Sequence, residues 1–144
     1  MIRVKKILCV CYGNTCRSPM FQALLSRELK NRGIEAEVES AGILAAVGAP
    51  ANEKAIVCME EKGLDMTNHR TRLVSDLDLS SYDVVFCIAL AIKATQTLID
   101  LGVLLDKIEF VVAADPYGMD IETYRACAET LARKAAAIAN KLAG

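Results

Sequence analysis

Short hydrophobic segments alternate with longer segments of helical periodicity along the chain, and this alternation is the feature that most restricts its fold. Runs or alternations of hydrophobic residues predict four strands, within residues 4–10, 35–40, 82–90 and 107–112. Helical spacing predicts four helices, at residues 18–33, 51–63, 91–102 and 121–142. This order predicts an α/β fold: a three-layer sandwich with a four-stranded, mainly parallel sheet and helices on both faces.

The last predicted helix carries an apolar stripe that permits two interpretations. The stripe consists of Ile121, Tyr124, Ala128, Leu131, Ala135, Ile138 and Leu142. A stripe with these spacings of three and four occurs in coiled coils and in helices that pack on a sheet. The alanines suit close packing and the helix is of modest length, so we expect it to pack on the sheet.

Length, charge and cysteine usage restrict the class of protein. A chain of 144 residues is expected to form one domain, residues 1–144. The 17 Lys and Arg nearly balance the 18 Asp and Glu, so we expect neither nucleic-acid nor membrane binding. No segment approaches the roughly 20 apolar residues of a membrane span. The six cysteines are scattered, which favours reduced thiols and a cytoplasmic protein.

The turn between the first predicted strand and the first predicted helix, CYGNTCRS, has the composition of an anion-binding loop that contains a nucleophile. Parallel sheets place their sites at the carboxyl ends of strands, where this turn lies. Backbone N–H groups and the helix start attract a phosphate, and Arg17 offers a fork for two oxygens. These positive surroundings favour the reactive thiolate form of Cys11, which Ser18 can hydrogen-bond. Gly13 allows a positive φ, and Asn14 is the next most tolerant residue.

Residues 10–19, VCYGNTCRSP, resemble the signature V-C-x-G-N-x-C-R-S-P of the low molecular weight protein tyrosine phosphatases. A second match, ADPYG, follows the fourth predicted strand and contains Asp115. The resemblance implies that Cys11 attacks phosphorus, that Arg17 binds the phosphoryl oxygens, and that Asp115 serves as general acid and then as base. It implies a phosphocysteine intermediate, with no metal and no cofactor.

The resemblance also assigns the residues around this centre. The phosphate-binding residues would be Tyr12, Gly13, Asn14, Thr15, Cys16 and Ser18, with Tyr117 as a further wall of the cleft. The ESAG and HRTR segments resemble family elements in which Ser40 and His69 hydrogen-bond Asn14 and support the loop. Without the resemblance, Ser40 reads as part of a strand-ending turn and His69 as an exposed polar residue.

The cysteines near the loop allow several interpretations. In the family, the counterparts of Cys11 and Cys16 can form a reversible disulfide, whereas Cys16 can equally be a packing residue, and the sequence leaves both open. A metal site at Cys9, Cys11 and Cys16 lacks a fourth ligand, and we expect none. The remaining three are expected in the core: Cys58, Cys87 and Cys127.

Departures from the family pattern leave the substrate open. The chain has no Trp, and its GILAAVGAP segment makes a smaller cleft wall than the Trp that many tyrosine phosphatases carry. We predict hydrolysis of phosphotyrosine in proteins or peptides by a monomer or weak dimer, with phosphate and other oxyanions as inhibitors. Thr15 stands where many tyrosine phosphatases have Ile and the related protein arginine phosphatases have Thr, so phosphoarginine is the first alternative.

Two further alternatives are weaker. Arsenate reductases of the same fold rely on additional cysteines, and no close cysteine pair follows residue 80. A phosphate-binding module without turnover would have no need of Asp115 beside Cys11 and Arg17.

Overall fold

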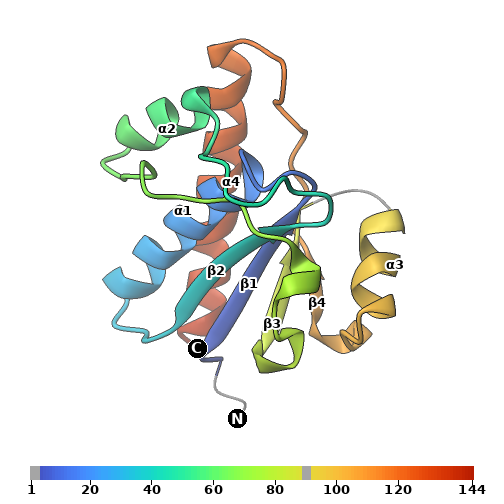
Figure 1. Ribbon diagram of the computed structural model, residues 1–144. Coiled ribbons are helices and arrows are strands. Elements are labelled where there is room, and N and C mark those ends of the chain that lie inside the picture. Colours follow the sequence, from blue (N-terminus) through green and yellow to red (C-terminus); the bar gives the residue numbers. More distant parts are fainter. Residues whose placement is uncertain (1–3, 89–91) are drawn as a thin grey trace.

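The computed structural model describes residues 4–88 and 92–144, which contain a four-stranded sheet of order β2-β1-β3-β4 (Figure 1). The strands are β1 (Lys6–Cys11), β2 (Glu37–Gly42), β3 (Val84–Cys87) and β4 (Ile108–Phe110). All three neighbouring pairs are parallel, with Cys9 opposite Ser40 on β2 and opposite Phe86 on β3. The sheet is therefore wholly parallel, and its strands end at the same edge.

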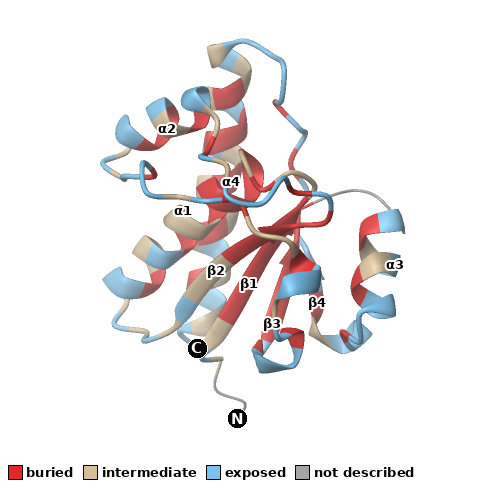
Figure 2. Ribbon diagram, in the orientation of Figure 1, coloured by how far each residue is buried: buried red, intermediate tan, exposed pale blue. Residues whose placement is uncertain are grey.

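Helices cover both faces of this sheet, as Figure 1 shows. They are α1 (Arg17–Asn31), α2 (Glu53–Glu60), α3 (Ile92–Asp100) and α4 (Ile121–Leu142). Alternate residues of β1 point to opposite faces: Ile7 and Cys9 join the core under α1 and α4, whereas Leu8 and Val10 join the core under α3. The central strands are buried along their length (Figure 2).

The predicted fold class is confirmed, with small differences in element bounds. α4 has the predicted range and packs its stripe, including Leu131 and Ala135, into the core beside α1, so it is a packed helix rather than a coiled coil. β2 extends to Gly42, two residues beyond prediction, because it continues to pair with β1 as far as Cys11. Residues 89–91 of the predicted third strand and third helix lie outside the described residues.

The connections at the carboxyl edge of the sheet place the site. Residues 12–16 join β1 to α1, residues 43–52 join β2 to α2, and residues 111–120 lead from β4 to α4. All three connections meet at the upper end of the sheet in Figure 1. Parallel β-α units produce this convergence, because every strand delivers its following loop to the same edge.

Candidate active site

The loop of residues 12–16, named the phosphate loop below, directs its carbonyl groups outward. Four carbonyls, counting that of Cys11, accept hydrogen bonds from neighbouring segments: Cys11 O from Ile43 N (3.0 Å), Tyr12 O from Leu44 N (3.0 Å), Asn14 O from His69 Nε2 (2.7 Å) and Thr15 O from Asn52 N (2.9 Å). Within the described part of the chain, the N–H groups of residues 12–16 have no acceptor. The loop thus presents unpaired donors, as an anion site requires.

Asn14 lies at the centre of the phosphate loop, fully buried and with a φ of 59°. Its Oδ1 accepts from Arg72 N (2.9 Å), so its Nδ2 faces and donates to Ser18 Oγ (2.8 Å) and Ser40 Oγ (3.0 Å). Of the two residues expected to tolerate a positive φ, the left-handed one is Asn14 and not Gly13, and the Asn14 side chain turns inward to reach these partners.

The directions of these hydrogen bonds determine which atom of Ser18 faces Cys11 Sγ. Ser18 Oγ accepts from Asn14, so its hydroxyl proton is free to point at Cys11 Sγ, 2.9 Å away. A donor at this distance stabilises a thiolate more than a thiol. The expected contact between Ser18 and the sulfur is therefore present.

Ser40 and His69 support the loop from behind. Ser40 Oγ accepts a hydrogen bond from Asn14 and donates one to Gln22 Oε1 (2.7 Å). The carbonyl of Asn14 accepts from His69 Nε2, which therefore carries a proton. Burial lowers the pKa of His69 below its usual 6.5, against the smaller opposing effect of this hydrogen bond. The hydrogen bonds expected of both residues to Asn14 are present.

Arg17 and Asp115 face each other across the site. The guanidinium of Arg17 is buried, donates from Nη1 to Ala113 O (3.2 Å), and lies 3.5 Å from Asp115 Oδ2 through Nη2. The Asp115 side chain is about half exposed (53%), and its Oδ1 accepts from Tyr117 N (3.1 Å). The structure therefore brings together Cys11, Arg17 and Asp115, although Asp115 is almost 100 residues away in sequence.

The start of α1 differs from the starts of α2 and α4. Asn52 caps α2, Asp120 caps α4, and both helices have an acidic residue in the first turn. α1 begins after Cys16 with no side-chain cap and no acidic residue in its first turn. Its amino-terminal partial positive charge is thus left for an external anion, directly beside the phosphate loop.

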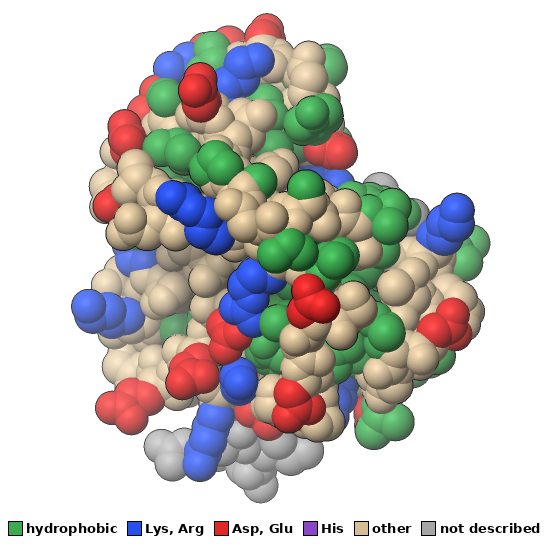
Figure 3. Space-filling model, in the orientation of Figure 1, with side chains coloured by type: hydrophobic (Ala, Val, Ile, Leu, Met, Phe, Trp, Pro, Cys, Tyr) green, Lys and Arg blue, Asp and Glu red, His purple; other side chains and the backbone are tan. Residues whose placement is uncertain are grey.

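These elements enclose a cavity of about 330 Å³. Its lining consists of Cys11, Tyr12, Gly13, Thr15, Cys16, Arg17, Ala46, Asp115 and Tyr117. Every predicted catalytic residue and both predicted aromatic walls line it, whereas Asn14, Ser18, Ser40 and His69 lie behind it. Figure 3 shows hydrophobic side chains gathered over the face that the loop after β2 crosses, where Leu44 and Val47 are exposed.

Gly42 is a supporting residue that sequence reasoning named only within a motif. A Cβ at Gly42 would lie 2.5 Å from Tyr12 O and 3.1 Å from Asn14 Cβ, so any side chain would displace the phosphate loop. By contrast, a Cβ at Gly13 would meet only Thr15 Oγ1, at 3.7 Å. The sequence signal for Gly42 is its place at the end of ESAG, two residues after the predicted strand.

Burial of polar side chains is concentrated in this region. The buried polar residues of the described chain are Asn14, Arg17, Ser18, Ser40 and Thr71. Burying such groups costs free energy unless they are hydrogen-bonded, and each of the five has a partner. Thr71, which sequence reasoning did not single out, accepts from Ala49 N and donates to Ala46 O, and so holds the loop that lines the cavity.

Cys16 points toward α4. Its Sγ lies 3.3 Å from the hydroxyl of Tyr124 and 3.6 Å from Thr15 Oγ1. Burial raises the pKa of Cys16 and of Tyr124, and it raises the pKa of Cys127 to about 11. All six cysteines are free thiols here, and no group of three potential metal ligands occurs among residues 4–88 and 92–144.

Comparison with known proteins decides the family. Residues 6–144 match the profile described as "Low molecular weight phosphotyrosine protein phosphatase". The chain belongs to this family. Among its relatives, a "Probable low molecular weight protein-tyrosine-phosphatase EpsP" from Ralstonia nicotianae is 33% identical, covering 90% of each chain. A "Protein-arginine-phosphatase" from Geobacillus stearothermophilus is 32% identical, covering 95% of each.

Solved structures of the family have the same fold. A low molecular weight protein tyrosine phosphatase from T. tengcongensis superposes with a TM-score of 0.86 at 32% identity, covering 95% of this chain and 99% of that one. A YwlE mutant from Bacillus subtilis superposes with a TM-score of 0.87 at 26% identity, covering 96% and 98%. The predictions of family, fold and protein phosphatase activity class are confirmed, and relatives named for both substrates are similarly close.

Proposed function

We propose that this chain hydrolyses phosphotyrosine in proteins or peptides, with Cys11 as nucleophile and Asp115 as general acid and base. The observation that carries the proposal is one cavity that has Cys11, Arg17 and Asp115 in its lining beside a loop of unpaired N–H donors. Tyr12 and Tyr117 line the same cavity and suit an aromatic ring between them.

In the first step, Cys11 Sγ attacks phosphorus while the bond from phosphorus to the leaving oxygen breaks. Asp115 gives its proton to that oxygen, and the product is a phosphocysteine. Arg17, the loop N–H groups and the start of α1 stabilise the charge on the phosphoryl oxygens. The incoming phosphate replaces Asp115 as the partner of Arg17.

In the second step, Asp115 takes a proton from water, and the resulting hydroxide attacks phosphorus. The phosphorus–sulfur bond breaks, which releases inorganic phosphate and restores the thiolate. Ser18 stabilises that leaving sulfur through the hydrogen bond it already makes. No metal takes part in either step, and we expect phosphate and other oxyanions to inhibit by occupying the loop.

Phosphoarginine is the second candidate substrate. Thr15 lines the cavity, where a hydroxyl can hydrogen-bond a guanidinium or orient water, whereas Ile at this place would only pack. A relative named as a protein-arginine-phosphatase matches almost the full chain.

The test is phosphate release from matched phosphotyrosine and phosphoarginine peptides, with the Cys11→Ser protein as blank. Faster release from phosphotyrosine supports the first substrate, and Thr15→Ile should then retain activity. Faster release from phosphoarginine, together with its loss in Thr15→Ile, would make phosphoarginine the substrate in place of phosphotyrosine. Release from neither peptide would contradict both and return the chain to a phosphate-binding module.

We further infer that residues 1–144 act as a single phosphatase domain, as a monomer or weak dimer in the cytoplasm. The buried free thiols suit a reducing compartment. No helix among the described residues is long and apolar enough to cross a membrane.

A further inference from the structure

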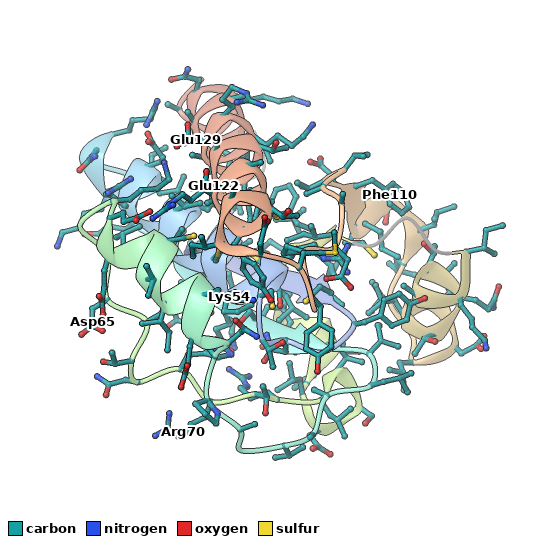
Figure 4. The ribbon with its side chains drawn as sticks, turned by 90° about the horizontal axis from the view of Figure 1, so that it is seen from above. Lys54, Asp65, Arg70, Phe110, Glu122 and Glu129 are labelled. Carbon is teal, nitrogen blue, oxygen red and sulfur yellow. The ribbon has the colours of Figure 1, made fainter. Side chains whose placement is uncertain are left out.

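The first turn of α2 is hydrogen-bonded both to the phosphate loop and to the segment that carries Asp115. At its start, Asn52 N donates to Thr15 O of the phosphate loop (2.9 Å), and Asn52 Oδ1 caps the helix by accepting from Lys54 N (2.9 Å). The side chain of Lys54 extends the other way, and its Nζ donates to Met119 O (2.5 Å), just before α4. Figure 4, which labels Lys54, shows it between α2 and the segment that leads into α4.

The segment of residues 115–119, named the acid loop, is internally stiff. Tyr117 N donates to Asp115 Oδ1 (3.1 Å), and Met119 N donates to Pro116 O (3.0 Å). Gly118 has a φ of 79°, which a tight turn requires. These two consecutive turns leave little freedom between Met119 and Asp115, so the position of one constrains the position of the other.

Few contacts from outside hold the acid loop. Ahead of Asp115, Arg17 donates to Ala113 O (3.2 Å) and Cys127 Sγ of α4 lies 3.6 Å from Ala114 O. Arg17 also pairs with Asp115 itself, but it must bind the phosphate as well. Beyond Asp115, within the described chain, Lys54 is the only side chain of another element that hydrogen-bonds to residues 116–119. Pro116 is buried and Asp120 caps α4, so among the described residues Lys54 adds the one side-chain hydrogen bond from another element at the carboxyl end of the acid loop.

Lys54 is itself held in place by α4. Its ammonium lies 5.7 Å from the ring centre of Tyr124, within cation–π range. Tyr124 is fully buried, and its hydroxyl touches Cys16 Sγ (3.3 Å). Lys54 thus connects the acid loop to a side chain that contacts the phosphate loop.

We propose that Lys54 is a positioning residue that keeps Asp115 at the distance from Cys11 where it can protonate the leaving oxygen. This inference rests on the proposed role of Asp115 as general acid. Lys54 does not line the cavity, so it acts through the acid loop and not on the substrate. Its loss should impair proton donation while leaving the phosphate loop and its affinity for anions intact.

The experiment measures kcat/KM for aryl phosphates whose leaving phenols range from strongly to weakly acidic. A weakly acidic phenol needs the proton of Asp115, whereas a strongly acidic one leaves without it. For Lys54→Met we expect a loss of about tenfold with the weakest acid and less than about twofold with the strongest, a part of the 100- to 10,000-fold that general acids supply. Lys54→Arg keeps a donor and a cation, and should recover most of the activity.

Lys62→Met is the matched control. Lys62 also bridges to α4, through an ion pair with Glu129, which Figure 4 shows farther along that helix than Glu122 of the first turn. The Lys62→Met variant also lacks a lysine that joins the region of α2 to α4, but Lys62 contacts neither the phosphate loop nor the acid loop. The leaving-group dependence of this variant should therefore equal that of the wild type. Inhibition by inorganic phosphate should be unchanged in both variants, and Lys54 is exposed, so melting temperatures should stay close to that of the wild type.

An equal loss on every substrate, or no loss, in Lys54→Met would overturn the inference, provided that Asp115→Asn shows the steep leaving-group dependence of a missing acid. If Asp115→Asn shows no such dependence, the proposed role of Asp115 is wrong, and the role of Lys54 is overturned with it. The two failures are therefore distinguishable in one data set.

Discussion

Asn14 uses both polar atoms of its side chain and its own carbonyl to hold the phosphate loop. One amide group joins three segments of the chain: Ser18 in α1, Ser40 in β2 and the backbone of Arg72. It also sets the direction of the hydrogen bond from Ser18 to Cys11. A single side chain therefore couples the shape of the loop to the chemistry of its nucleophile.

Replacing Asn14 with Ala should disable the site and weaken the fold. The change leaves buried partners unsatisfied, which costs about 1–3 kcal/mol, and displaces the loop, for which a fall in kcat/KM of about 100-fold is expected. Urea denaturation and aryl phosphate hydrolysis measure the two effects. The exposed Asn68→Ala is the control, and wild-type kcat/KM in Asn14→Ala would contradict the importance of this network.

His69 should make stability depend on pH in a defined window. Because its pKa is lowered in the folded protein, the unfolded chain binds the proton more strongly. The free energy of unfolding should therefore fall as the pH drops below 6.5, and this loss should stop once the folded pKa is passed. Glu39, whose pKa is also lowered, loses its contribution only as the pH falls below 4.5.

Unfolding of wild type and His69→Gln at about pH 7.5 and about pH 5.5 measures this effect. The wild type should lose more stability between these values than the variant, which has no titrating group at this position. An equal loss in both proteins would assign the pH dependence to other groups.

At the scale of elements, the uncapped start of α1 is the counterpart of the capped starts of α2 and α4. A side-chain cap on α1 would occupy the N–H groups that the phosphate needs, so the helix is completed by its ligand. Arg17, its first residue, supplies the cation.

Inorganic phosphate should therefore stabilise the protein through α1. At 100 times its dissociation constant, a ligand of the folded state adds about 2.7 kcal/mol, which appears as a higher melting temperature. Arg17→Met should lose most of this shift, whereas Arg125→Met, which removes a partly exposed arginine of α4 outside the cavity, should retain it. The same shift in Arg17→Met would show that phosphate binds elsewhere.

At the scale of the whole molecule, all six cysteines are buried, and their surroundings rather than their burial distinguish Cys11. Cys9 and Cys127 have raised pKa values because they lie in the core, and so does Cys16. Cys11 and Cys16 both line the cavity, but Cys11 Sγ receives the hydroxyl of Ser18, whereas Cys16 Sγ contacts the hydroxyl of Tyr124. Position in the fold, and not residue type, decides which thiol can react.

Iodoacetamide at neutral pH should therefore alkylate Cys11 before the other five cysteines of the native protein. Peptide mass spectrometry measures the order, and added phosphate should slow the reaction by occupying the cavity. The Cys11→Ser protein is the control for slow labelling of the rest. Labelling of Cys16 at the rate of Cys11 would contradict this order and show that the contact with Tyr124 does not protect it.

Much of the fold and the centre of the site follow from local sequence. The alternation of strands and helices determined a parallel α/β sheet, because the two periodicities and the handedness of crossovers leave few other arrangements. Cys11, Ser18 and Arg17 lie within eight residues, so the β1–α1 turn alone brings them together. Local sequence marked both Gly13 and Asn14 as able to take a positive φ, and the distant partners of Asn14 decided between them.

Only the tertiary structure decided how distant residues meet at the site, including Asp115, Ser40 and His69, which the family resemblance assigned to it. Strand order and helix packing bring Asp115 to Arg17, Arg72 to Asn14 and Lys54 to the acid loop, and no local pattern encodes these meetings. Tyr124 illustrates what helical spacing can and cannot predict. Its spacing predicts a core residue, which it is, but not the contact of its hydroxyl with Cys16. The sequence determined the chemistry of each side chain, whereas contacts between residues far apart in the chain depend on how the whole molecule packs.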